Sequence, residues 1–268
     1  MVAATDQPGR PSSGPVENVR DKVSGTIDRV GDTFDDVRGT VTGAVHTLST
    51  TVSDTVERKI KPRLRGWIHA GTFPFALAAS ITLVALAPGA AAKWSVAVFG
   101  LTAALLFGTS AVYHRGTWSP RTEGILRRAD HSNIFLIIAG TYTPLAVTLL
   151  DQRAATILLW IVWSGALAGL IGRIVWLHAP RWVYTPIYVA LGWVAVGYMK
   201  AFWEAGGPAV VWLVISGGIA YTLGAVVYAT KKPDPSPRWF GFHEIFHVLT
   251  VVGFACHVVA IYLAALRA

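Results

Sequence analysis

Seven stretches of mostly apolar residues constrain what this chain can fold into more than any other feature of its sequence. Each has about 20 residues, which is the length that an α-helix needs to cross the hydrocarbon core of a bilayer. They occupy residues 67–87, 94–114, 129–149, 154–177, 183–200, 209–229 and 242–266, with short turn segments between them. The sequence therefore predicts an all-α integral membrane protein with seven transmembrane helices.

The composition argues against a soluble helical bundle. Charged residues make up 14% of the chain, against about 25% in a typical soluble domain, and most of the apolar stretches lack a polar stripe at helical spacing. The formal net charge of +8 could indicate a nucleic-acid partner. In a membrane protein, however, such an excess marks the cytoplasmic loops, so no nucleic-acid partner is expected.

Lysine and arginine residues are distributed unevenly between the two sides of the predicted bundle. Fourteen precede the first stretch or lie near the loops after the second, fourth and sixth stretches, whereas four lie on the opposite side. Because basic residues concentrate in cytoplasmic loops, this bias predicts a cytoplasmic N-terminus and a C-terminus outside.

Residues 1–60 are expected to form a polar arm ahead of a membrane domain at 61–268. The start of the arm is rich in Pro, Gly and Ser, which predicts disorder. From Val16 to Val56 an apolar residue then recurs about every 3.6 positions, the period of an α-helix. This pattern predicts an amphipathic helix on the membrane surface or against a partner helix. Its glycines and β-branched residues also fit a weakly helical, solvated linker.

Ionisable side chains inside spanning segments are costly, so they are candidates for function. His114 ends the second stretch, Asp130 opens the third, and His243 and His247 open the seventh. The predicted topology brings all four to the cytoplasmic side. His243 and His247 are four residues apart, so they share one helix face at a spacing suited to chelating one metal ion.

Three neutral imidazoles can supply three of the four ligands of a tetrahedral zinc site and leave the fourth position for water. Zinc at His114, His243 and His247 would activate that water as a nucleophile. Asp130 could accept its proton or orient it, and Ser110, one turn from His114, could hydrogen-bond a substrate carbonyl. The competing interpretation is that each histidine is an interfacial polar residue.

Other polar residues in the spans are weaker candidates. His69 either lines a cavity next to these histidines or packs against neighbouring side chains. His131 directly follows Asp130, so it points to another side of its helix. His257 lies about 15 Å deeper than His247, so an interhelical hydrogen bond is expected for it. Arg173 and His178 are expected at the membrane interface.

Four motifs resemble the progestin and adiponectin receptor family, most closely its bacterial hemolysin III branch: Ser110-Ala-Val-Tyr-His114, Asp130-His131, Gly140-Thr-Tyr-Thr-Pro144 and His243-Glu-Ile-Phe-His247. The resemblance runs from about Lys61 to the C-terminus and leaves out the arm. It implies seven helices in a bacterial plasma membrane, with zinc near the cytoplasmic face on the three histidines and Asp130 holding the water. One position departs from the family pattern, because Arg65 stands where an Asn would precede the first-span histidine.

Several functions fit these residues. The leading interpretation is a zinc-dependent hydrolase of lipid amides or esters, with a membrane lipid as partner and a role in lipid homeostasis or cytolysis. The alternative is a receptor or membrane-homeostasis protein that zinc stabilises without turnover. An intramembrane metalloprotease is a third, because His243 to His247 fits H-E-x-x-H with Glu244 as general base. A pore is not favoured, since no span has a regular polar stripe.

Overall fold

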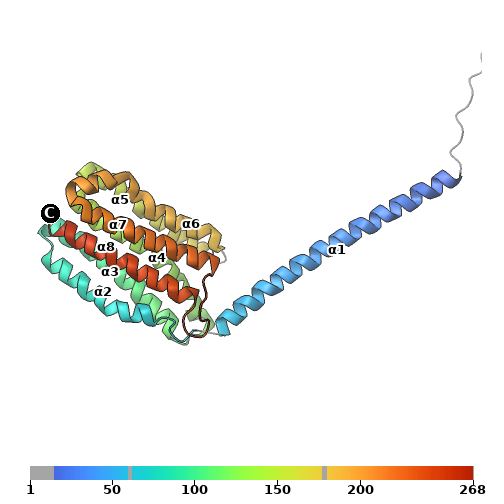
Figure 1. Ribbon diagram of the computed structural model, residues 1–268, viewed down its shortest axis with the longest axis horizontal. Helices are drawn as coiled ribbons and strands as arrows, with labels where there is room; N and C mark the ends of the chain where they lie inside the picture. The colour runs from blue at the N-terminus through green and yellow to red at the C-terminus, as the bar shows by residue number, and fades with distance from the viewer. Residues whose placement is uncertain (1–14, 60–61, 177–179, 268) are drawn as a thin grey trace, which may run out of the picture. The chain divides into compact units, whose positions relative to one another are not determined.

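The computed structural model describes residues 15–59, 62–176 and 180–267. The disorder expected over residues 1–14 and the interfacial position expected for His178 lie outside this part of the chain. The chain divides into two units, Met1–Ile60 and Lys61–Ala268, and each is described by itself (Figure 1). The described residues of the first unit form one helix, α1, over Pro15–Lys59.

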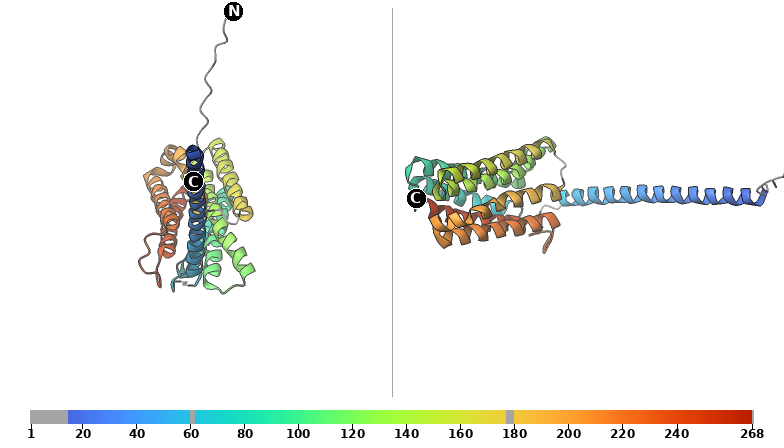
Figure 2. Two further views of the ribbon diagram at one scale, coloured as in Figure 1. Left: turned by 90° about the vertical axis from the view of Figure 1, so that its right-hand side faces the viewer. Right: turned by 90° about the horizontal axis from the view of Figure 1, so that it is seen from above.

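The second unit is a bundle of helices that run roughly alongside one another (Figure 2). Its described residues contain no strand, apart from one isolated bridge between Ser236 and Phe240. The helices are α2 (Trp67–Leu86), α3 (Gly89–Arg115), α4 (Pro120–Leu149), α5 (Gln152–Val175), α6 (Arg181–Gly192), the 3-10 helix η1 (Trp193–Tyr198), α7 (Met199–Thr230) and α8 (Phe242–Ala265). In the described residues, six helical stretches are long and apolar enough to cross a membrane. The all-helical membrane fold is thus confirmed.

One of the six stretches runs from Arg181 to Thr230 and has 50 residues. A straight helix of that length would measure about 75 Å, far more than the bilayer core of about 30 Å. Gly207 interrupts it with φ 79° and ψ 175°, and Pro208 follows. The chain turns back there (Figure 1), so that the Trp193 indole N–H donates to Thr222 Oγ1 at 2.9 Å.

Side-chain caps explain where two of the helices begin. Asp151 Oδ1 accepts hydrogen bonds from the backbone N–H groups of Arg153 and Ala154, each at 3.0 Å. Ser119 Oγ accepts from Thr122 N–H at 3.3 Å, with Pro120 as the first residue of α4. With this cap, α4 begins before residue 129, where the apolar stretch was predicted to start. The first turns of the helix are polar, so they were not part of that apolar stretch.

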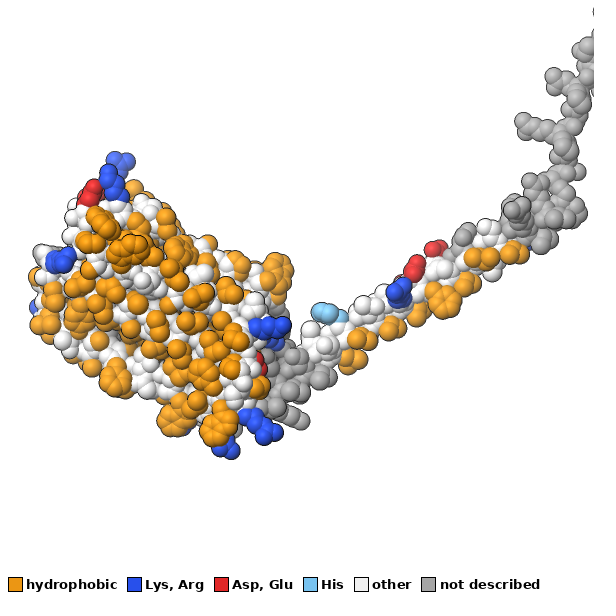
Figure 3. Space-filling view, in the orientation of Figure 1, with side chains coloured by type: hydrophobic (Ala, Val, Ile, Leu, Met, Phe, Trp, Pro, Cys, Tyr) orange, Lys and Arg blue, Asp and Glu red, His pale blue; other side chains and the backbone are white. Residues whose placement is uncertain are grey.

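Small residues let the central helices approach closely. A Cβ on Gly140 of α4 would lie 2.0 Å from Thr102 Oγ1 of α3, so only glycine fits this contact. Of the candidate spans, α4 has the largest buried share. The outside of the bundle is covered by apolar side chains (Figure 3), among them Phe75, Trp94 and Trp160. An apolar outer surface around a polar-containing interior is what a lipid environment favours.

Candidate metal centre

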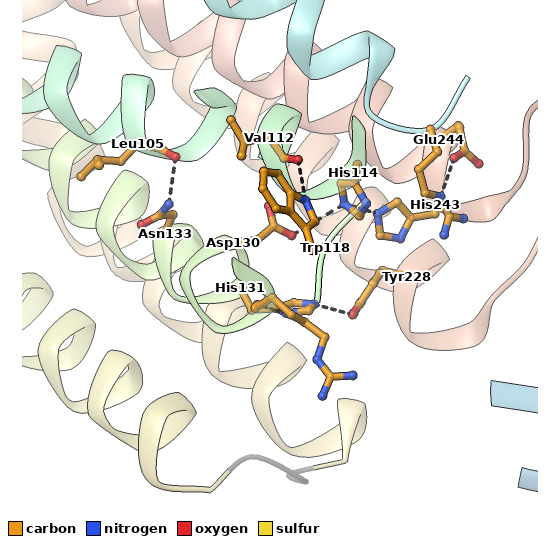
Figure 4. Close-up of polar contacts among 12 residues, drawn as sticks. Leu105, Val112, His114, Trp118, Asp130, His131, Asn133, Tyr228, His243 and Glu244 are labelled. Carbon is orange, nitrogen blue, oxygen red and sulfur yellow. Dashed lines mark hydrogen bonds and ion pairs between the residues drawn. The ribbon is translucent and has the colours of Figure 1, made fainter. Parts of the chain in front are cut away.

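Three imidazoles from two helices converge at one end of the bundle. His114 lies in the last turn of α3, and His243 and His247 lie in the first turns of α8. One ring nitrogen from each lies within 4.8 Å of the others, and the Nε2 atoms of His114 and His243 are 3.2 Å apart (Figure 4). Ligand nitrogens around tetrahedral zinc, each about 2.1 Å from the metal, are separated by about 3.4 Å. The His114–His243 distance matches this value, and the three-histidine donor set could hold a metal ion such as zinc.

The start of α8 is held by two carboxylates. Asp234 Oδ1 accepts from the Phe242 N–H at 3.1 Å, and Glu244 Oε2 accepts from the Gly241 N–H at 2.9 Å. These bonds satisfy backbone donors that a helix N-terminus leaves without partners. They also hold the turn that carries His243.

Glu244 has a second partner outside its own helix. Its Oε1 atom accepts from Arg65 Nε at 2.9 Å, and the carboxylate is almost fully buried. In Figure 4 the Glu244 side chain lies on the far side of His243 from His114 and Asp130. Oε1 of Glu244 thus joins α8 to the segment before α2, while Oε2 caps the start of α8 itself.

His114 is packed against a glycine that no other residue can replace without strain. Gly66 has φ 80°, and a Cβ at this position would lie 2.7 Å from His114 Cβ. Next to it, the Arg115 guanidinium stacks 3.5 Å from the centroid of the Trp67 ring. The segment before α2 therefore contacts the candidate ligand His114 through Gly66, and through Arg65 it contacts the turn of α8 that carries His243.

Asp130 and Ser110 lie beside the imidazoles. Asp130 Oδ2 is 3.7 Å from His114 Nε2. Ser110, one turn before His114 on α3, is 1% exposed and lines the same cavity as Asp130 and His243. The structure thus brings together all five residues that the sequence singled out.

The other histidines have separate roles. His69 is buried and stacks on His247, with ring centroids 3.7 Å apart and an interplanar angle of 8°. His69 therefore lines the cavity and also packs against the His247 ring. His131 turns away from the metal ligands, with Nε2 3.0 Å from the Tyr228 hydroxyl. His257 Nε2 lies 3.2 Å from the Val214 carbonyl oxygen on α7, which confirms the expected interhelical hydrogen bond.

Arg173 lies in the last turn of α5, and the interfacial depth expected for it stays a prediction. Its side chain is buried, and the guanidinium lies 4.4 Å from the centroid of the Tyr184 ring. Arg181 lies in the same way 4.7 Å from the Tyr228 ring. These arginines and tyrosines form a second polar cluster near His131, which sequence reasoning missed. No local pattern links α5, α6 and α7 at these positions, so the cluster is visible only after packing.

A cavity of about 130 Å³ extends from the metal centre into the bundle. His69, Asp130 and His243 line one end, and His257 lines the cavity farther along α8. Most of the wall between them is apolar, with residues such as Ile138. A polar end joined to an apolar body is the shape and chemistry that suit an amphiphilic molecule.

Comparison with known proteins identifies the family. The profile of the Haemolysin-III related family matches residues 57–258. The chain is 32% identical to the Hemolysin-3 homolog of Bacillus subtilis (strain 168) over 168 residues, which cover 61% of this chain and 78% of that protein. Hemolysin-3 of Bacillus cereus is 30% identical over 166 residues, covering 62% and 73%.

A plant protein is also similar. The heptahelical transmembrane protein ADIPOR2 of Oryza sativa subsp. japonica is 28% identical over 185 residues, covering 63% of this chain and 81% of that protein. These matches confirm the resemblance that the motifs indicated. This multi-pass membrane protein belongs to the Haemolysin-III related family, the hemolysin III branch of the progestin and adiponectin receptor family.

Proposed function

We propose that this hemolysin III-like protein holds a zinc ion on His114, His243 and His247 and hydrolyses lipid amides or esters at that site. The observation that supports the proposal most is the placement of the three ring nitrogens within 4.8 Å of one another, beside a largely apolar cavity that His243 and His247 line. Three nitrogen donors leave one zinc position open, as in catalytic rather than structural sites.

Each group of the site has a role in this proposal. Bound zinc supplies a Lewis acid that polarises a carbonyl group and makes water a better nucleophile. Asp130, 3.7 Å from His114, orients the attacking water and takes its proton. The Ser110 hydroxyl donates to the carbonyl oxygen of the scissile group. The apolar cavity walls hold the acyl chain and keep bulk water out.

The main alternative is a zinc site without turnover. The Nε2 atoms of His114 and His243 are 3.2 Å apart, and this contact already joins the end of α3 to the start of α8. A metal ion there would strengthen this junction, and the open position would then have no substrate. Retained zinc together with no fatty-acid release from a broad panel of amides and esters would favour this alternative.

The protease interpretation of His243 to His247 has less support. In a zinc metalloprotease of this type (a zincin), the glutamate of H-E-x-x-H must face the water bound to the metal. Here both Glu244 oxygens accept hydrogen bonds, from Arg65 and from Gly241. Glu244 is therefore better explained as a structural residue.

For the topology, we propose seven crossings with a cytoplasmic N-terminus and a C-terminus outside. The break at Gly207 divides the 50-residue stretch into two segments, each long enough to cross. The first residues of the membrane unit and the C-terminus lie at opposite ends of the bundle (Figure 1), which an odd number of crossings requires. In this orientation the metal centre opens toward the cytoplasm.

Metal analysis of the purified full-length protein tests the site. We expect about one zinc per chain in the wild type and a large loss in His114→Ala and His247→Ala. His257→Ala is the matched control, because this histidine is on the same helix as His247 but bonds to Val214. Unchanged zinc in both ligand variants would remove the basis of the proposal.

Turnover is tested separately with the same preparations. Asp130→Ala should keep its zinc and lose fatty-acid release from ceramide or a related lipid amide. If Asp130→Ala retains the wild-type rate, the role given to Asp130 is wrong.

A further inference from the structure

Helix α1 carries an exposed apolar line that the metal centre does not explain. Apolar side chains recur at every third or fourth position from Val23 to Leu48, and their exposed fractions run from 48% at Val30 to 71% at Phe34. Figure 3 shows them as a continuous row along one side of the helix. Isolated apolar residues on a surface are ordinary, but a row of this length on one face indicates a surface that something covers.

The opposite side of α1 is polar. With 3.6 residues per turn, Asp32 and Asp36 point away from the row that contains Phe34 and Val41. In Figure 3 the acidic side chains of this helix stand on the side away from the apolar row. Threonine and glycine cover much of the remaining surface. The helix therefore has one face suited to an apolar environment and one suited to water.

The geometry of the row favours a flat surface as its partner. Between Val23 and Val41 the steps alternate between four and three residues, as in a heptad. Over residues 16–56, however, eleven steps cover 40 residues, a mean of about 3.6, so the full row stays on one side of a straight helix. A two-stranded left-handed coiled coil would instead need a repeat of about 3.5. The row from Val23 to Leu48 covers about 38 Å of α1, and a straight row matches a plane better than a supercoiled partner.

The chain itself holds α1 close to a membrane. It ends at Lys59, and α2, a candidate span, begins at Trp67. Even fully extended, the connecting residues reach only about 30 Å. Apart from Arg65, which pairs with Glu244, four basic residues lie at the end of α1 or in the connection: Arg58, Lys59, Lys61 and Arg63. Basic clusters beside a spanning helix are attracted to anionic lipid headgroups.

We infer that α1 lies in the plane of the membrane surface, on the leaflet where α2 begins, and that it binds lipid there. Its apolar row enters the boundary between headgroups and acyl chains, and the acidic face stays in water. The ligand class is an anionic bilayer surface. This inference concerns the arm and holds whether or not the metal centre turns over a substrate.

Spin labels on the full-length protein in lipid nanodiscs test the inference. In a Cys256→Ser background, single cysteines replace Phe34 or Val41 on the apolar row, and Asp36→Cys is the matched control on the polar side. The measurement is the accessibility of each label to oxygen, which concentrates in the bilayer, and to a water-soluble nickel chelate. Nanodiscs of phosphatidylcholine with phosphatidylglycerol are compared with phosphatidylcholine alone.

We expect labels at positions 34 and 41 to favour oxygen over the nickel chelate several-fold more than the label at 36, with a larger contrast on anionic nanodiscs. Adding Val30→Asp and Val37→Asp should remove the protection of the label at 34. Equal access of nickel to all three labels would overturn the inference in favour of a solvated linker. Strong dipolar coupling between labels on two copies, with both reagents excluded from positions 34 and 41, would overturn it in favour of a paired helix.

Discussion

Arg65 Nε donates a 2.9 Å hydrogen bond to Glu244 Oε1, and this ion pair joins the segment before α2 to the first turn of α8. The same turn carries His243, so the pair supports the candidate metal centre from outside the three histidines. At Arg65 the chain departs from the family pattern, and at Glu244 the sequence suggested a protease base. The structure gives both residues one shared role.

Arg65→Ala should destabilise the protein. It leaves the buried Glu244 carboxylate without its cation, and breaking such a pair costs about 3 kcal/mol. Equilibrium unfolding in mixed detergent micelles measures the loss. The matched control is Arg63→Ala, because this exposed guanidinium only stacks on Trp239, 4.5 Å from the ring centroid, a contact worth about 1 kcal/mol or less. Equal losses in the two variants would contradict the role given to the pair.

Glu244→Gln should keep its zinc and most of its hydrolytic rate. The amide still presents an acceptor to the Gly241 N–H, and Figure 4 places Glu244 on the far side of His243 from Asp130. A zincin with this substitution would retain zinc but lose turnover. Metal content and fatty-acid release, measured on the same preparation beside Asp130→Asn, distinguish the two cases. Loss of turnover only in Glu244→Gln would revive the protease interpretation.

Gly66→Ala should lower zinc occupancy. The new Cβ would meet His114 Cβ at 2.7 Å, and an alanine at φ 80° is strained by about 1–2 kcal/mol. Gly89→Ala is the control, because Gly89 has φ 66° but nothing within 4 Å of the added Cβ. Both variants should lose stability through backbone strain, Gly66→Ala more because of the added contact, but only Gly66→Ala should lose metal. Equal zinc contents would show that His114 does not depend on this contact.

His69→Ala should weaken zinc binding by about tenfold, a typical effect of removing a group that supports a ligand. The substitution leaves the His247 ring without the side chain stacked on it at 3.7 Å. His69→Phe should restore most of the affinity, since neither ring nitrogen of His69 has a hydrogen-bond partner in the described residues. Competition with a zinc-selective chelator measures both values. Failure of phenylalanine to rescue would mean that His69 acts through its nitrogens.

Much of the fold was predictable because apolar run length reports directly on membrane spans. The run beginning at Trp67 and the run beginning at Phe242 predicted where α2 and α8 start. Apolar run length did not predict the start of α4, because the first turns of this helix are polar and begin at the Ser119 cap. The seven crossings and their direction remain predictions, because α6, η1 and α7 form one continuous stretch by length and composition.

For the candidate site, the sequence by itself determined which residues meet at one depth. Chain order and alternating helix direction bring the end of α3 and the start of α8 to the same end of the bundle, so His114 and His243 could be paired without coordinates. The i, i+4 spacing placed His247 on the same face. These inferences need only the axial position of each residue, which the rise per residue sets.

Only the tertiary structure decided how each helix is rotated about its axis. That rotation stacks His69 on His247, buries Arg173 against Tyr184 and pairs Arg65 with Glu244. It depends on close contacts such as Gly140 against Thr102, where side-chain volumes from distant parts of the chain must fit. No local pattern encodes such contacts, so the residues that support the metal centre emerged from packing.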